Sequence, residues 1–102
     1  MYEARAKVFK AFSDERRLRI LEVLQHGEKC SCVLQDKIDM PQSSLSYHMK
    51  ILHEAGIVEG RQEGKWTYYH ISPEGCQAAM DMLKASTTVT DDGDPCGEFC
   101  CK

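Results

Sequence analysis

The chain has 102 residues, six cysteines and a formal net charge of -3. This length suits one domain with a modest core that a partner chain helps to stabilise, and no apolar run is long enough to span a membrane. The amino-terminal segment MYEARAKVFKAF lacks the apolar stretch of a secretory signal, so we expect a cytoplasmic protein whose clustered thiols bind metal or sense redox state rather than form structural disulfides.

The negative charge is confined to the carboxyl-terminal residues. From residue 91 onward four carboxylates stand against Lys102 alone, and residues 1–90 are neutral, with 12 basic and 12 acidic side chains. A neutral domain is not repelled by nucleic acid, but its affinity for phosphate is modest. We therefore expect a homodimer that combines two half-sites on double-stranded DNA.

The first two predicted helices cover residues 3–12 and 14–26. The first is amphipathic, and its wide apolar side suits either the core or a dimer interface. Ser13 is expected to cap the second helix, whose predicted core face is Leu18, Leu21 and Leu24, backed by Ile20. The second helix also carries arginines that form a solvated face or contact backbone phosphate: Arg16, Arg17 and Arg19.

Two helices joined by a short turn follow. Residues 31–38 predict a short helix that ends in a turn at Asp39–Met40, and a longer helix runs from Pro41 to Gly56. The longer helix has one narrow apolar face, formed by Leu45, Met49, Leu52 and Ala55. Its opposite face carries hydrogen-bonding side chains and no carboxylate: Ser43, Ser46, Tyr47 and Lys50. This arrangement is a helix-turn-helix, and the second helix is expected to contact DNA.

Cysteines cluster at two places in the chain. Cys30 and Cys32 lie where the first helix of the helix-turn-helix begins, and the helix dipole and unpaired backbone N–H groups favour a thiolate there. Three more lie in the last seven residues, namely Cys96, Cys100 and Cys101. The isolated Cys76 is expected to act as a small core hydrophobe. Clustered thiolates indicate a site for a soft metal or metalloid ion.

Residues 57–71 predict a β-hairpin that turns at residues 62–65, and a final helix starts at Ser72 and Pro73. A hairpin directly after a helix-turn-helix is a wing, and its tip offers Arg61, Gln62 and Lys65 to DNA. The fold class is therefore mainly α with one β-hairpin, in the order α-α-α-α-β-β-α. We predict a domain at residues 1–87, and a flexible, acidic, cysteine-rich tail at residues 88–102.

This order of elements resembles the ArsR/SmtB family of winged helix-turn-helix repressors, and the likeness extends from about Ala4 to Leu83. It is most specific in the runs CSC, SSLSYHMKILHEAGIV and EGKWTYYHI, which are very similar to the arsenic-responsive branch. The resemblance implies a homodimer that binds operator DNA and leaves it when a metal or metalloid ion binds. It places the DNA contacts on the recognition helix and the wing, at Gln42, Ser43, Ser44, Ser46, Tyr47, His48, Lys50, Arg61 and Lys65. For His48, which lies at the edge of the apolar face, a half-buried structural role is an equal alternative.

The resemblance also implies the effector. Trivalent arsenic and antimony prefer three thiolates, whereas four sulfurs suit zinc and cadmium better. The arsenic repressors place a third cysteine where this chain has Gln35, so Cys30 and Cys32 supply two sulfurs. Either one tail cysteine completes their site, which is the arrangement we favour, or Cys96, Cys100 and Cys101 form a separate site.

The expected function is an arsenite- or antimonite-responsive repressor with no organic cofactor and no membrane partner. On the same scaffold, a redox or persulfide sensor, or a sensor of Cd(II) or Pb(II), remains an alternative. An enzyme is not expected, because the chain has no phosphate-binding glycine loop, no paired catalytic carboxylates and no CxxC motif beside a βαβ pattern.

Overall fold

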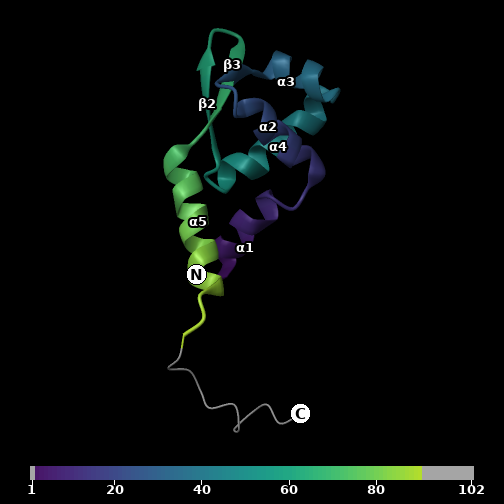
Figure 1. Ribbon diagram of the computed structural model, residues 1–102. Helices are drawn as coiled ribbons and strands as arrows, with labels where there is room; N and C mark the ends of the chain where they lie inside the picture. The colour runs from purple at the N-terminus through teal and green to yellow at the C-terminus, as the bar shows by residue number, and fades with distance from the viewer. Residues whose placement is uncertain (1, 91–102) are drawn as a thin grey trace.

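The computed structural model describes residues 2–90 as helices with a small sheet (Figure 1). In chain order the elements are α1 (Tyr2–Ala11), α2 (Glu15–Leu24), β1 (Lys29–Cys30), α3 (Ser31–Ile38), α4 (Gln42–Glu54), β2 (Val58–Glu63), β3 (Trp66–Ile71) and α5 (Pro73–Thr87). Helices α1 and α5 lie side by side at one end, and the β2–β3 hairpin lies at the other. The predicted winged helix-turn-helix is confirmed. Residues 91–102, which include Cys96, Cys100 and Cys101, lie outside the described residues.

The predicted cap of α2 was wrong by one residue. Asp14, not Ser13, occupies the N-cap in an extended conformation, and its carboxylate accepts a hydrogen bond from the Arg16 N–H at 2.7 Å. The Ser13 hydroxyl instead donates to the Lys10 carbonyl at 2.8 Å and closes the end of α1. An aspartate can serve as a cap as well as serine does, and its charge favours the positive end of the helix dipole.

The core face of α2 also differs from the prediction. Ile20 and Leu24 are buried, but Leu18 is 50% exposed and Arg17 is only 4% exposed. Residues 17, 20 and 24 follow the three- and four-residue spacing of one helix face, so burying Ile20 and Leu24 brings Arg17 inward and turns Leu18 outward. The interpretation of Arg17 as a solvated or phosphate-binding arginine was therefore wrong.

The two helices of the helix-turn-helix match the prediction closely. Asp39 ends α3 in the left-handed region at φ 58°, which is the turn expected at this position. In α4, Leu45, Met49 and Leu52 are almost fully buried, and Ala55 packs against the same core. The apolar face predicted from helical spacing is therefore the face that holds the recognition helix on the domain.

The hairpin forms as predicted, but the sheet has a third strand. Val58 pairs with Ile71 and Glu63 with Trp66, so Gly64, at φ 64°, and Lys65 form a two-residue turn. Strand β1, just before α3, pairs antiparallel with β3 and gives the order β1-β3-β2. A two-residue strand is too short to produce an alternating pattern, which is why the sequence did not predict it.

The last helix begins as expected, because the Ser72 hydroxyl accepts a hydrogen bond from the Gly75 N–H at 3.1 Å and Pro73 occupies the first turn. Helix α5 ends at Thr87, the predicted limit of the domain. The boundary of a tail at 88–102 remains a prediction. Within residues 2–90, no helix is long and apolar enough to cross a membrane.

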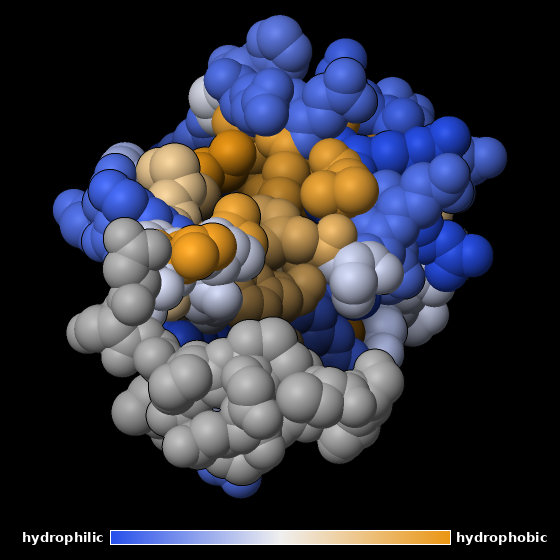
Figure 2. Space-filling model, turned by 60° about the horizontal axis from the view of Figure 1, so that its bottom comes forward, coloured by the Kyte–Doolittle hydropathy of each residue, from blue (hydrophilic) through white to orange (hydrophobic). Residues whose placement is uncertain are grey.

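The end of the molecule formed by α1 and α5 carries an apolar hollow (Figure 2). Ala4, Val8, Ala55 and Met82 line a hollow between α1, α4 and α5. Leu83, the next residue along α5, is 54% exposed. We call these five apolar residues the α1–α5 face; the charged side chains of Glu3, Lys7 and Glu54 line the same hollow. Part of the predicted apolar side of α1 covers the core, since Val8 and Ala11 are buried, and part remains exposed at this face.

Candidate DNA-binding face and thiol pair

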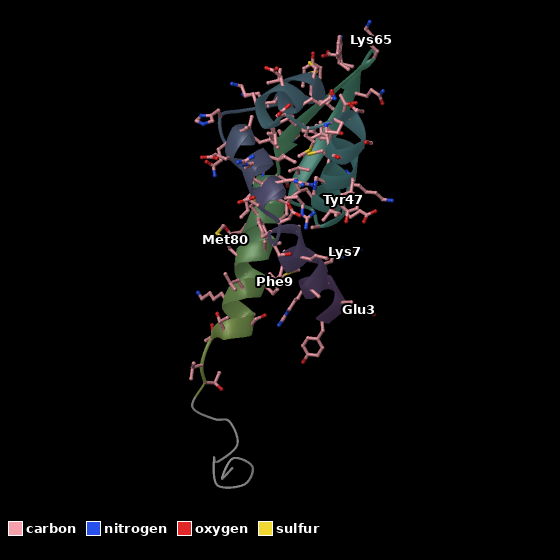
Figure 3. All side chains as sticks on the ribbon, turned by 90° about the vertical axis from the view of Figure 1, so that its right-hand side faces the viewer. Glu3, Lys7, Phe9, Tyr47, Lys65 and Met80 are labelled. Atoms are coloured by element: carbon pink, nitrogen blue, oxygen red, sulfur yellow. The ribbon has the colours of Figure 1, made fainter. Side chains whose placement is uncertain are left out.

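The exposed face of α4 carries most of the side chains predicted to contact DNA. Gln42, Ser43, Ser46, Tyr47 and Lys50 are exposed, and Ser44 is half-buried. Figure 3 shows Tyr47 on the outer side of α4, and Lys65 at the tip of the wing. The amide of Gln42 donates to the Ser46 hydroxyl at 3.0 Å, so these two side chains support each other on successive turns.

His48 is not on this face. It is 3% exposed, and its Nδ1 lies 3.0 Å from Arg17 Nη1, which makes Nδ1 the acceptor of a hydrogen bond from the guanidinium. The predicted DNA contact at His48 is therefore wrong, and the alternative of a structural histidine is correct. Burial lowers the pKa of His48; Asp14 opposes this effect, and Arg17 and Arg16 reinforce it.

The wing presents two different faces. Alternation along β2 directs Glu59, Arg61 and Glu63 to one side and Gly60 and Gln62 to the other. The second side forms a groove with α4, lined among others by Lys50, His53, Gln62 and Thr67. The sequence offered no signal for His53 or Thr67, because their place in the groove depends on how the wing folds against α4.

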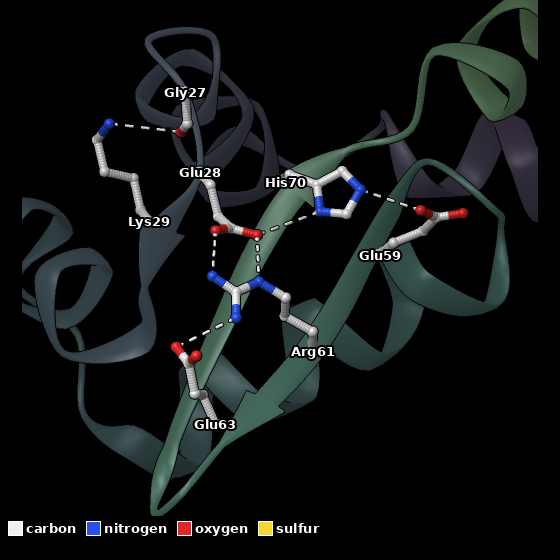
Figure 4. A network of polar contacts seen from close by, with 7 residues as sticks. All are labelled: Gly27, Glu28, Lys29, Glu59, Arg61, Glu63 and His70. Atoms are coloured by element: carbon white, nitrogen blue, oxygen red, sulfur yellow. Dashed lines mark hydrogen bonds and ion pairs between the residues drawn. The ribbon is translucent and has the colours of Figure 1, made fainter.

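Arg61 lies in a network of polar contacts (Figure 4). Its guanidinium donates to both carboxylate oxygens of Glu28, at 2.8 and 3.1 Å, and to Glu63 at 3.2 Å, and it lies 4.8 Å from the centre of the Tyr68 ring. The hydrogen bond from Arg61 lowers the pKa of Glu28, and the two carboxylates raise that of Arg61. The charge of Arg61 is thus already paired, whereas Lys65 lies over the Trp66 ring and Lys50 makes no ion pair within residues 2–90.

A second group of basic side chains lies beside the turn of the helix-turn-helix. Arg16 and Arg19 line a hollow together with Asp39, Met40 and Ser44 at the start of α4. Both arginines are exposed, unlike Arg17. Of the three arginines considered in the sequence, these two keep a geometry that suits contact with backbone phosphate.

The two cysteines at the start of α3 are in direct contact. Cys30 is the N-cap residue of α3, in an extended conformation, and the thiol of Cys32 donates to Cys30 Sγ at 2.9 Å. This hydrogen bond, with backbone N–H groups of the first turn, lowers the pKa of Cys30, and it raises that of Cys32, the proton donor. Cys30 is half-buried and Cys32 is exposed, so both sulfurs are open to a small ligand.

The other described cysteine takes no part in this pair. Cys76 packs against the core at the start of α5, and burial raises its pKa, as expected of a core hydrophobe. Within residues 2–90, no group of three or more cysteine, histidine, aspartate or glutamate side chains is placed to hold a metal ion. A three-thiolate site that includes Cys30 and Cys32 therefore needs a sulfur from outside these residues or from a second chain.

Comparison with known proteins agrees with this fold. A family model described as "Bacterial regulatory protein, arsR family" matches residues 14–60. An uncharacterised HTH-type transcriptional regulator of Methanocaldococcus jannaschii, MJ1325, is 46% identical over 83 residues, which cover 80% of this chain and 93% of that protein. The homodimeric winged helix-turn-helix domain Mb0332 of Mycobacterium bovis, solved by NMR, superposes with a TM-score of 0.68 at 31% identity and covers 83% of this chain and 81% of its own.

Two relatives have names that refer to metal resistance. The arsenical resistance operon repressor of Bacillus subtilis is 42% identical over 67 residues, which are 65% of this chain and 64% of that protein. The cadmium resistance regulatory protein CadC homolog of Staphylococcus aureus is 41% identical over 70 residues, which are 68% of this chain and 58% of that protein. The matched part thus spans less than two thirds of either resistance regulator.

Proposed function

The chain belongs to the ArsR family of winged helix-turn-helix transcriptional regulators, which are not enzymes, and we propose that it is a dimeric repressor released from its operator by As(III) or Sb(III). The ligand binds thiolates that include Cys30 and Cys32. The observation that carries this proposal is the contact of those two sulfurs at the start of α3, the first helix of the helix-turn-helix. A ligand at this position acts directly on the element that supports the recognition helix.

The chemistry of the pair favours a soft, thiophilic ion. Cys30 has the lowered pKa that a ligand thiolate needs, and Cys32 can lose its shared proton when an ion replaces it. The third thiolate comes from Cys96, Cys100 or Cys101, which lie outside the described residues. A separate site formed by these three cysteines alone is the second arrangement that an experiment has to distinguish.

The DNA contacts come from α4 and the wing tip. The proposed contacts are the exposed or half-buried side chains Gln42, Ser43, Ser44, Ser46, Tyr47 and Lys50, with Lys65 at the tip. We assign the α1–α5 face to the dimer interface, because it is apolar and lies at the end of the molecule opposite the wing. The homodimeric state of the Mycobacterium bovis domain supports this assignment. A dimer would place its two recognition helices in successive major grooves.

A different effector is the second candidate function. The similarity to a cadmium resistance regulator favours Cd(II) or Pb(II) at a cysteine-only site. The contact of Cys30 with Cys32 also suits reversible oxidation by peroxide or a persulfide, with As(III) playing no part. In both alternatives the protein is still a DNA-binding repressor, and only the effector that releases it from DNA differs.

Fluorescence anisotropy of a labelled promoter fragment tests the proposal. We expect reduced wild-type protein to bind the fragment and to release it on addition of As(III) or Sb(III), but not of Zn(II) or peroxide. Cys32→Ser should bind DNA normally and resist arsenite, and Cys76→Ser, the control, should behave as wild type. Release from Cys32→Ser combined with resistance after truncation before Cys96 would place the sensor in the tail, and release by Cd(II) or peroxide alone would select an alternative effector.

A further inference from the structure

The thiol pair is joined to the wing by the backbone of the small sheet. Strand β1 ends at Cys30, which lies opposite Tyr68 of β3, and Lys29 lies opposite Tyr69. Strand β3 in turn pairs with β2 along its length. A displacement of Cys30 therefore has a direct route into the wing, in addition to the route through α3 into α4.

A side-chain bridge crosses the same junction (Figure 4). Glu28, two residues before Cys30, accepts hydrogen bonds from Arg61 Nη2 at 2.8 Å and from Nε at 3.1 Å. A two-point contact of this kind fixes the angle between the groups as well as their distance. The ring of Tyr68, the residue opposite Cys30, lies against the same guanidinium. Arg61 of β2 thus contacts both Glu28, which precedes the thiol pair in the chain, and Tyr68, which lies opposite Cys30 in the sheet.

The remaining carboxylates of this network lie within the hairpin. Glu63 contacts Arg61 at 3.2 Å and Glu59 contacts His70 at 3.0 Å, and all four residues belong to β2 or β3. Glu28 also approaches His70, at 3.6 Å. Among the ion pairs of residues 2–90, those of Glu28 alone join the segment before the cysteines to the wing.

We propose that Glu28 and Arg61 form a bridge that transmits ligand binding at Cys30 and Cys32 to the wing. Glu28 and Arg61 are positioning residues here, because they set the angle of the hairpin relative to β1 and do not bind the ligand. The inference rests on the proposed function, because it takes the two thiols as the ligand site.

The ligand provides the movement. As(OH)₃ exchanges one hydroxyl for each thiolate that joins it, so two thiols yield a dithiolate and release two waters, with no change in oxidation state. Binding of both sulfurs to one arsenic atom replaces the Cys32–Cys30 hydrogen bond by two covalent bonds to that atom and so resets the relative position of the two cysteines. Cys30, at the end of β1, carries part of this rearrangement to Glu28.

The chain contains its own reporter for this movement. Trp66 is its single tryptophan, lies at the start of β3 and is 44% exposed, so its fluorescence reports on the wing. Reduced full-length protein is titrated with sodium arsenite and, in parallel, with phenylarsine oxide. The latter joins two thiols with release of one water and needs no third sulfur. Loss of free thiols, measured separately, gives the binding of each arsenical.

We expect wild-type protein to show a change in Trp66 fluorescence, and Glu28→Gln and Arg61→Gln to lose most of that change while binding both arsenicals normally. The double variant should lose no more than either single variant, because both act on one bridge. Glu63→Gln is the matched control. Like Glu28→Gln, it removes one carboxylate charge beside Arg61, but it leaves the ion pair between Arg61 and Glu28 intact, so it should respond as wild type.

A Glu28→Gln protein that binds phenylarsine oxide and responds as wild type would overturn the bridge. An equal loss in Glu63→Gln would also overturn it, because charge rather than the link would then matter. The wild-type protein could also respond to phenylarsine oxide but fail to bind arsenite. If Glu28→Gln then lost the response to phenylarsine oxide, the proposed effector would be contradicted and the bridge would still be supported.

Discussion

Arg17 donates a hydrogen bond to His48 Nδ1 at 3.0 Å and thereby joins α2 to the buried side of the recognition helix. The same guanidinium donates to the carbonyl of Ala11 at 3.0 Å and to that of Lys10 at 3.1 Å, at the end of α1. One buried arginine thus fixes α1, α2 and α4 relative to one another. Because α1 contributes to the α1–α5 face, Arg17 also connects the proposed dimer interface to the helix that is proposed to contact DNA.

Replacing Arg17 should destabilise the domain strongly. Arg17→Met keeps much of the side-chain volume but leaves the Ala11 carbonyl and the His48 ring without their donor, whereas the Lys10 carbonyl keeps its hydrogen bonds from Ser13. We expect a loss of about 3 kcal/mol in the free energy of unfolding. Urea denaturation at pH 7.5 and constant protein concentration measures this loss. Arg19→Met, on the exposed side of the same helix, should change stability by less than about 0.5 kcal/mol. Similar values for the two variants would contradict the structural role of Arg17.

His48 should make stability depend on pH. Burial lowers its pKa in the folded protein, so below about pH 6.5, the ordinary value for histidine, the unfolded chain takes up a proton that the folded chain resists. Stability is therefore fully present above this pH and falls as the pH decreases toward the lowered pKa, by at most about 1.4 kcal/mol per pH unit. Denaturation of His48→Gln between roughly pH 7.5 and 5 should show a flatter dependence than wild type.

The matched control for this experiment is His26→Gln, which changes an exposed histidine after the end of α2. It should keep the pH dependence of the wild-type protein. An unchanged slope in His48→Gln would show that another group is responsible for the loss of stability in acid.

Cys30 should be the most reactive of the three described thiols. The hydrogen bond from Cys32 lowers its pKa, whereas burial raises that of Cys76, so iodoacetamide at pH 7 should alkylate Cys30 first. Cys32→Ala removes the donor and should slow alkylation of Cys30. Cys32→Ser supplies a hydroxyl donor in its place and should preserve more of the rate. Peptide mass spectrometry measures each site, and equal rates in the two variants would exclude the Cys32 hydrogen bond as the cause.

Gly75 permits a close approach between α5 and the end of α4. A Cβ atom at this position would collide with the backbone carbonyl of Gly56, which cannot move aside as a flexible side chain does. Gly75→Ala should therefore cost at least about 2 kcal/mol of stability. Gly64→Ala, in open space at the turn of the wing, is strained only by its φ of 64° and should cost about 1 kcal/mol. The reverse order in thermal or urea denaturation would contradict this packing.

The elements that the sequence predicted correctly depend on neighbouring residues. The apolar face of α4 follows from helical spacing, the wing from two β-prone runs around Gly64, and the start of α5 from Ser72 and Pro73. Each of these patterns involves residues that are close in the sequence, so the structure that it predicts depends little on contacts with distant segments. The exposure of the α4 side chains that are proposed to contact DNA could be predicted for the same reason.

The remaining features depend on contacts between distant segments. Arg17 is buried because carbonyls of α1 and a histidine of α4 converge on it. Arg61 is paired because Glu28, 33 residues earlier, lies across the sheet from it. The spacing of Cys30 and Cys32 does not by itself bring the two sulfurs into contact. In the structure they are in contact where Cys30 has the extended backbone conformation of the α3 N-cap. Sequence spacing can identify such residues as candidates for a role, but it cannot identify the residues with which they form hydrogen bonds or ion pairs.

The two basic residues of the wing should contribute differently to DNA binding. Lys65 is exposed at the tip and should contact phosphate directly, whereas the charge of Arg61 is paired with Glu28. Lys65→Gln should therefore flatten the dependence of log Kobs on log salt by about 0.9 for each lost contact, and Arg61→Gln should change it less. Anisotropy of the labelled promoter fragment at several KCl concentrations measures these slopes, with Lys84→Gln in α5 as the control. An equal flattening by Arg61→Gln would mean that Arg61 exchanges its carboxylates for phosphate in the complex.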